Sequence, residues 1–217
     1  MQWLKLPSRK YDRNSLELIV DTLKKGGIIL CPTDTSYLIG ADAKNELSIK
    51  KVYNLKGRDK SKPIHVIVAD LKMAQKYAKF NIPAKKLARS LFPEKISLIL
   101  EKKSNLLSSN LTGDKPTIGI RIPNLKLNTD ISKGLGGPYT ATSANKSGKP
   151  NSYSAEEFLM HLSHEEANLI DLVIDFGKLA KSKPSTIVDC TTAPLKLLRR
   201  GPVSKRLIEK TLGSKID

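Results

Sequence analysis

Apolar residues recur along the chain in two alternating patterns, one helical and one strand-like. The first helix is predicted to begin at Asn14 or Ser15 and to end at Gly26-Gly27. Further helices are predicted over residues 47–55, directly after Asp70, over 83–92 with Pro83 in the first turn, over 154–162 and over about 203–212. Short apolar runs predict strands at residues 28–31, 64–69, 96–100, 117–122, 169–176, 186–190 and 195–198, and another at Tyr139.

Helices and strands are mixed throughout, without a break in composition or an internal repeat. This order predicts a single α/β domain over residues 1–217. Several connections are short enough for hairpins, which favours a mixed sheet. Residues 102–115, rich in Ser, Asn and Lys, are predicted to form a mobile loop, and residues 177–184 a second basic loop.

The net charge is the extreme feature of the composition. The chain carries 38 Lys and Arg against 21 Asp and Glu, a formal charge of +17 over 217 residues. A charge of this size favours anionic partners, such as nucleic acid, polyphosphate or an anionic membrane. Solvated surface lysines would give the same total, so the charge alone does not choose among these interpretations.

Several classes of protein are disfavoured by what the chain lacks. No apolar run approaches the ~20 residues of a membrane-spanning helix, and residues 1–14 lack the apolar core of a signal peptide. Cys31 and Cys190 have no metal-type spacing, which fits reduced thiols and a cytoplasmic location. His161 and His164 have no third ligand candidate nearby, so we expect no metal held by protein ligands.

Polar residues gather at 142–148, where a predicted strand ends; they read Thr-Ser-Ala-Asn-Lys-Ser-Gly. Ser143 and Asn145 alternate, so they can face the same side. Ligands of open α/β sheets collect at the carboxyl ends of strands. The alternative is an Asx-rich turn that only satisfies its own backbone.

Cationic side chains also lie at or near the ends of predicted strands and in turns. These are Lys56, Arg58, Lys62, Arg121 and Arg199. One sheet could gather them into an anion site, because guanidinium groups bind carboxylate and phosphate bidentately. No Ser–His–acid set, Cys–His pair or P-loop motif is present. The chemistry indicated is positioning and charge stabilisation, as in phosphoryl or nucleotidyl transfer, and the alternative is a set of unrelated solvated charges.

Six segments, in this order along the chain, resemble the motifs of the YrdC family of threonylcarbamoyl-adenylate synthases. They are Lys25-Gly-Gly-Ile-Ile-Leu-Cys-Pro-Thr-Asp-Thr-Ser-Tyr37, Lys56-Gly-Arg58 with Lys62-Pro63, Thr117-Ile-Gly-Ile-Arg-Ile-Pro123, Ser143-Ala-Asn-Lys-Ser-Gly148, Ser185-Thr-Ile-Val-Asp189, and Arg199 before Gly201. The resemblance extends from about residue 14 to residue 212, and the chain resembles the family's single-domain form.

The resemblance implies a twisted mixed sheet flanked by helices around a deep basic cavity. It implies a reaction that joins L-threonine, bicarbonate and ATP into L-threonylcarbamoyl-AMP and releases pyrophosphate. The product would serve the N6-threonylcarbamoyl modification of adenosine 37 in tRNA, with transfer by separate partners of the TsaD/TsaB type. Mg²⁺ would be held mainly by phosphate and water, because no dense acidic cluster is present.

The resemblance also implies roles for individual residues. It makes Lys56 and Arg58 the catalytic pair of the basic turn, and Thr35, Arg121 and Ser185 contacts to threonine. The implied nucleotide contacts are Arg58, Lys62, Thr117, Ser143, Asn145 and Arg199.

The sequence departs from the family pattern at several positions. The substituted positions are Leu38 in place of glycine, Asp59 in place of proline, Glu94-Lys95 in place of a Gly-Pro pair, and Arg200 in place of glutamate. A histidine of one family branch corresponds to Ile67, and His65 is either a displaced substitute or a structural residue of its apolar strand.

Two other functions remain open. One is a double-stranded RNA or tRNA-binding module, which the charge would suit, although aromatic residues make up only 5% and no RNA-binding signature appears. If the protein is the enzyme, we expect RNA binding to be weak and non-specific. The other is a YciO-like relative without this activity, against which the intact Lys56-Gly-Arg58 and Ser143-Ala-Asn145 motifs argue.

Overall fold

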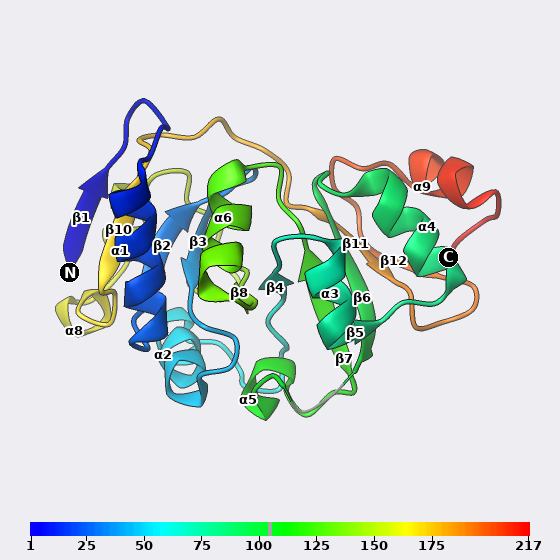
Figure 1. Cartoon of the computed structure of the whole chain (residues 1–217), viewed down its shortest axis with the longest axis horizontal. Coiled ribbons are helices and arrows are strands. Elements are labelled where there is room, and N and C mark those ends of the chain that lie inside the picture. The colour runs from blue at the N-terminus through cyan, green and yellow to red at the C-terminus, as the bar shows by residue number, and fades with distance from the viewer. Residues whose placement is uncertain (104–105) are drawn as a thin grey trace.

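The computed structural model describes residues 1–103 and 106–217, and its strands form two mixed sheets lying side by side (Figure 1). The first sheet has the order β1 (Gln2–Lys5), β10 (Leu172–Asp175), β2 (Ile29–Pro32), β3 (Tyr37–Gly40) and β9 (Thr142–Ser143). The second has the order β12 (Lys196–Arg199), β11 (Thr186–Asp189), β6 (Ile96–Lys102), β7 (Thr117–Arg121), β4 (Val66–Ile67) and β8 (Tyr139–Thr140), with β5 (Ala78–Lys79) paired to β6. The predicted mixed α/β fold is confirmed, and its strands are divided between two mixed sheets.

Two sheets arise because the chain changes partners within five residues. β8 pairs with β4 in the second sheet, and β9 pairs with β3 in the first. Ala141 lies between them, and its N–H donates to the carbonyl of His65 at 2.7 Å. The Thr140 hydroxyl accepts from Ala41 N and donates to Ile39 O, both at 3.0 Å. These bonds tie the two sheets together at this crossing.

Helices cover the sheets on their outer faces. α1 (Arg13–Lys24) and α6 (Lys126–Leu135) pack together over the first sheet, whereas α3 (Leu71–Tyr77), α4 (Ile82–Leu91) and α9 (Lys205–Leu212) lie beside the second (Figure 1). α2 (Glu46–Lys56) and α5 (Ser109–Thr112) lie together at one end. The buried apolar residues form two clusters, one of which holds Ile19, Leu23 and Ile131 against the first sheet. No helix in the described residues is long and apolar enough to cross a membrane.

The predicted helix ends were mostly confirmed, because local chemistry decides them. Asp70 and Ser154 cap α3 and α7 (Ala155–Leu159), and Gly57 ends α2 with φ of 57° in the left-handed region. The first helix begins earlier than predicted. Its cap is Asp12, whose carboxylate accepts from Ser15 N at 2.8 Å, rather than Asn14 or Ser15.

Other predictions needed correction. The strand predicted over 64–69 is only Val66–Ile67. The helix after Ser154 ends at Leu159, not Leu162. The predicted loop 102–115 contains α5, and residues 104–105 of it lie outside the described residues. Elements that were not predicted are β1, β3, β5, β9, α5, α6 and α8 (His164–Ala167).

Candidate functional site

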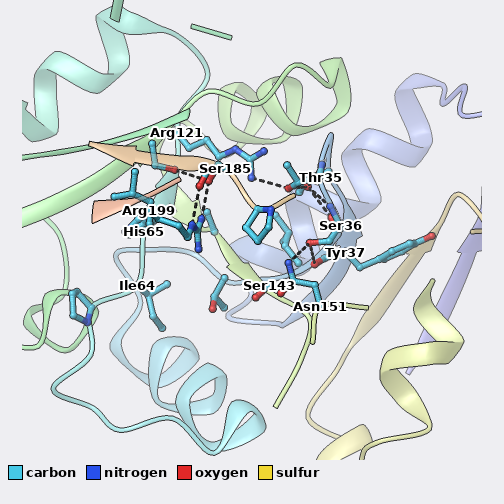
Figure 2. A pocket seen from close by; sticks show the side chains of 18 of the residues that line it. Thr35, Ser36, Tyr37, Ile64, His65, Arg121, Ser143, Asn151, Ser185 and Arg199 are labelled. Atoms are coloured by element: carbon cyan, nitrogen blue, oxygen red, sulfur yellow. Dashed lines mark hydrogen bonds between the residues drawn. The ribbon is translucent and has the colours of Figure 1, made fainter. Parts of the chain in front are cut away.

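A polar cavity of about 190 Å³ lies between the two sheets (Figure 2). Both sheets and the loops at their strand ends contribute to it. Its wall consists of Thr33, Thr35, Ser36, Tyr37, Leu38, Arg58, Pro63, Ile64, His65, Ser97, Arg121, Ala141, Thr142, Ser143, Asn151, Pro184, Ser185, Ile187 and Arg199. Three of the five cationic side chains predicted to form an anion site, Arg58, Arg121 and Arg199, therefore face one cavity.

The first group of interactions joins the loop after β2 to the end of β7. Arg121 donates from Nη1 to Thr35 Oγ1 at 3.1 Å and from Nη2 to Asp34 Oδ1 at 2.5 Å. The second oxygen of Asp34 accepts from Asn124 N at 3.2 Å. Burial lowers the pKa of Arg121, and the neighbouring Asp34 carboxylate partly offsets this effect. Asp34 and Thr35 together fix the guanidinium at the cavity wall, while its Nε has no partner in the described residues.

The loop after β2 owes its shape to Thr33. The Thr33 hydroxyl accepts from the N–H groups of Thr35 and Ser36, at 3.0 and 3.2 Å, and donates to Ser36 O at 2.7 Å. This is an ST-turn, in which a side-chain hydroxyl makes hydrogen bonds to the backbone of the residues that follow it. It directs the buried hydroxyl of Thr35 toward Arg121 (Figure 2).

The second group lies at the ends of β11 and β12. Arg199 donates from Nε to Ser185 O at 2.8 Å and from Nη2 to Ser185 Oγ at 3.0 Å. Ser97 Oγ lies 3.2 Å from Ser185 Oγ. A Cβ at Gly201 would lie 2.4 Å from Pro184 O and from Thr186 N. Glycine at 201 thus lets the end of β12 approach Ser185 closely enough for Arg199 to reach it.

The third group holds the 143–147 segment against the end of α2. Lys56 is 2% exposed, and its Nζ donates to Ser143 O, and to Asn145 O and Oδ1 at 2.9 Å each. Ser147 N donates to Lys56 O at 2.9 Å. Burial and the nearby Arg58 lower the pKa of Lys56 to about 7. Three oxygen acceptors match the three N–H bonds of the ammonium form.

The structure brings most of the predicted residues together, but not all of them. Thr35, Arg58, Arg121, Ser143, Ser185 and Arg199 line the cavity. Lys56, predicted to be catalytic, lies beneath the 143–145 loop and does not line the cavity. Lys62 is exposed, and Thr117 is at the opposite end of β7 from Arg121. Asn145 accepts from Ser143 Oγ at 2.6 Å and from Lys56 Nζ at 2.9 Å, and it donates to Lys149 O; its contact with nucleotide stays a prediction.

Seven polar wall residues were not among the predicted site residues: Thr33, Ser36, Tyr37, His65, Ser97, Thr142 and Asn151. Ser97 stands where the family pattern has threonine, which was an available signal. His65 was considered only as a structural residue or a displaced substitute. Ile67 is fully buried, whereas the imidazole of His65 reaches the cavity because β4 begins only at Val66.

The family departures lie mostly away from the cavity. Asp59 and Arg200 are exposed, and Lys95 donates to Ser182 Oγ at 3.0 Å. Leu38 is the exception, since it lies in β3 opposite Ser143 and forms part of the wall. Its side chain also packs in the apolar cluster of the first sheet.

The cavity is electropositive and suits anions. Its wall carries Arg58, Arg121 and Arg199, and none of the wall residues named above is a carboxylate. The described residues also contain no group of three His, Cys, Asp or Glu side chains able to hold a metal ion. Burial and Arg121 lower the pKa of Arg199, yet both guanidinium groups remain charged at neutral pH. An arginine-lined cavity at strand ends is the kind of site in which α/β proteins bind anionic ligands.

Comparison with known proteins identifies the family. The sequence model described as telomere recombination (Sua5/YciO/YrdC) matches residues 21–201. The chain therefore belongs to the Sua5/YciO/YrdC family. The threonylcarbamoyl-AMP synthase of Bacillus subtilis is 33% identical over 192 residues, which cover 88% of this chain and 54% of that protein. A Methanocaldococcus jannaschii protein, provisionally named for the same activity, is 37% identical over 88% of both chains.

The fold agrees with this membership. The structure of Pyrococcus abyssi Sua5 complexed with L-threonine superposes with a TM-score of 0.88 at 27% identity, over 100% of this chain and 62% of that one. The chain thus spans roughly half to two thirds of these two longer relatives and most of the M. jannaschii protein.

Proposed function

We propose that this protein is an L-threonylcarbamoyladenylate synthase, which makes L-threonylcarbamoyl-AMP and pyrophosphate from L-threonine, bicarbonate and ATP. The observation that carries the proposal is the joining, in one cavity, of Thr35 and Arg121 with Arg58 and Arg199. A relative of the same fold is known in complex with L-threonine. Family membership and this arrangement support the same reaction.

The geometry suggests that different arginines bind different parts of the substrates. Arg121, held by Asp34 and Thr35, would bind the carboxylate of threonine, because a fixed guanidinium matches a carboxylate. Arg199, fixed on Ser185, and Arg58 would stabilise the charge on the phosphates. Ser143 would contact the nucleotide. Lys56 would hold the loop that carries Ser143 rather than touch the substrates.

In the proposed reaction the threonine nitrogen attacks carbon dioxide derived from bicarbonate and forms a carbamate. A carbamate oxygen then attacks the α-phosphorus of ATP, and pyrophosphate leaves. Mg²⁺ would bind mainly through the phosphates and water, because the cavity wall offers no carboxylate of its own. The positions of Arg58 and Arg199 suit the negative charge that develops on the phosphates.

The test is pyrophosphate release from ATP by the purified protein. We expect release only when both L-threonine and bicarbonate are present, and less when L-serine replaces threonine. Omitting each component in turn provides the controls. Release that is independent of threonine, or none at all from a folded protein, would favour the YciO-like alternative.

Two further roles are part of the proposal. The product would pass to separate machinery of the TsaD/TsaB type for transfer to tRNA. RNA itself would bind weakly through the +17 charge, with an affinity that falls steeply as salt rises. A tight, sequence-selective RNA complex at moderate salt would instead support the RNA-binding module.

A further inference from the structure

The cavity wall carries three arginine side chains but few groups that can accept a proton. Its titratable wall residues are Tyr37, Arg58, His65, Arg121 and Arg199. The Tyr37 hydroxyl donates to Gly177 O at 2.9 Å and accepts from Phe176 N at 3.0 Å, and burial raises its pKa further. Arginine has no lone pair to offer. Only the imidazole of His65 remains as a titratable acceptor on this wall.

The carboxylate that pairs with Arg121 is already occupied. Asp34 gives one oxygen to Arg121 and the other to Asn124 N. An amino acid bound with its carboxylate on Arg121 would bring an ammonium group into the same cavity. That ammonium must lose a proton before its nitrogen can act as a nucleophile.

His65 is fixed by its backbone and by packing, not by its ring nitrogens. Its carbonyl accepts from Ala141 N at 2.7 Å, and its ring lies against Gly119, where a Cβ would be 2.3 Å from an imidazole carbon. Neither ring nitrogen bonds to any residue within 1–103 or 106–217. In Figure 2 His65 is labelled beside Arg199 and Ser185, among the wall side chains. The ring is therefore held in place at the cavity wall, with neither nitrogen bonded to a described residue.

The charged groups that shift the pKa of His65 are all arginines. Burial, then Arg199, Arg58 and Arg121, lower the pKa of His65 to about 4, so its imidazole is uncharged at neutral pH. Asp34 is the acidic group nearby, and it is paired with Arg121. Bound phosphates and a carboxylate would neutralise the arginines and make the imidazole a better proton acceptor.

We propose that His65 accepts a proton from the amino group of the amino-acid substrate once the anionic substrates fill the cavity. This inference rests on the proposed function. An N–H bond of the ammonium breaks and an N–H bond forms on the imidazole, which leaves a neutral amine and an imidazolium. The amine lone pair then forms the N–C bond to carbon dioxide. The second amine proton and the imidazolium proton pass to solvent, so the carbamate carries the remaining negative charge.

The first test is His65→Gln, which retains hydrogen bonding but cannot take up a proton. We expect kcat for threonine-dependent pyrophosphate release to fall about 100-fold, with the acidic limb of the kcat pH profile lost and the Kd for ATP unchanged within about 2-fold. His161→Gln, at an exposed histidine, is the matched control and should behave like the wild type. A His65→Gln enzyme with normal kcat and a normal pH profile would overturn the proposal.

The second test uses the wild-type protein and needs no turnover. The imidazole Cε1–H resonance of His65 is followed by NMR against pH, without ligand and with ATP plus threonine. We expect the titration midpoint to rise by at least about one pH unit when the ligands bind. An unchanged midpoint in a protein that binds both ligands would contradict the proposal, even if His65→Gln failed to fold. Absence of pyrophosphate release by the wild type would refute the proposed function instead.

Discussion

Asp34 and Arg121 form an ion pair at 2.5 Å in which both side chains are almost completely buried, at 7% and 9% exposure. Asp34 comes from the loop after β2 in the first sheet, and Arg121 ends β7 in the second. The pair therefore joins the two sheets across the cavity. It also compensates a guanidinium that the surrounding burial would otherwise leave isolated.

Asp34→Asn should be strongly destabilising, because it leaves the Arg121 charge buried without compensation. We expect the free energy of unfolding to fall by about 3–5 kcal/mol, measured by urea denaturation. The exposed pair of Arg13 and Glu17 provides the control, and Glu17→Gln should cost under about 1 kcal/mol. Equal losses in the free energy of unfolding for the two variants would show that the buried ion pair stabilises the protein no more than the exposed pair does.

Arg58→Ala should reduce the rate of threonylcarbamoyl-AMP formation by about 10²–10³-fold, as expected for a charge that stabilises the transition state. The fold should persist, because Arg58 only donates to the carbonyls of Lys62 and Pro63 at the cavity edge. The measurement is the steady-state rate of pyrophosphate release. Arg200→Ala, at an exposed position beside the site, is the control and should turn over normally.

Lys56→Met should affect stability before chemistry. The variant leaves three loop oxygens without their donor, which should cost about 1–3 kcal/mol. ATP binding should weaken as well, since the loop carrying Ser143 loses its anchor. The measurements are thermal unfolding and calorimetry. A variant that melts like the wild type but has lost turnover would contradict this role and indicate that Lys56 contacts the substrate directly.

Ser143→Ala and Asn145→Ala should separate ligand contact from turn structure. Ser143 lines the cavity, so we expect its alanine variant to bind ATP about 3–10-fold more weakly with little change in melting temperature. Asn145 bonds within its turn and to Lys56, so its variant should mainly lose stability, by about 0.5–2 kcal/mol. The opposite pattern, read by calorimetry and melting curves, would reverse these assignments.

Stability should fall on acidification through the titration of His65. Its pKa is lowered to about 4 in the folded protein from its ordinary value of 6.5. Between these values the unfolded chain binds a proton that the folded protein does not, so stability decreases as pH falls from 6.5 to 4. After solvent screening we expect a loss of up to about 2 kcal/mol from this residue. Urea unfolding of the wild type and His65→Asn across this range should differ in slope; parallel curves would contradict the prediction.

The sequence alone determined the features that neighbouring residues decide. Gly57, Asp70, Pro83 and Ser154 were predicted to bound or begin helices, and they do, because caps and φ restrictions act within a few residues. α6 escaped prediction because Asn128, Thr129, Ser132 and Gly134 obscure the apolar positions at 127, 131 and 135. Its helical state depends on packing against α1.

Only the tertiary structure decided which charges form the site. Lys56, Arg58 and Lys62 are nearly adjacent in sequence, yet one is buried beneath a loop, one faces the cavity and one is exposed. The change of sheet at Ala141 and the approach of His65 to Gly119 likewise join segments far apart in the chain. Composition and motif order can indicate an anion site, but strand pairing and close packing over long separations place its atoms, and neither is encoded in local sequence.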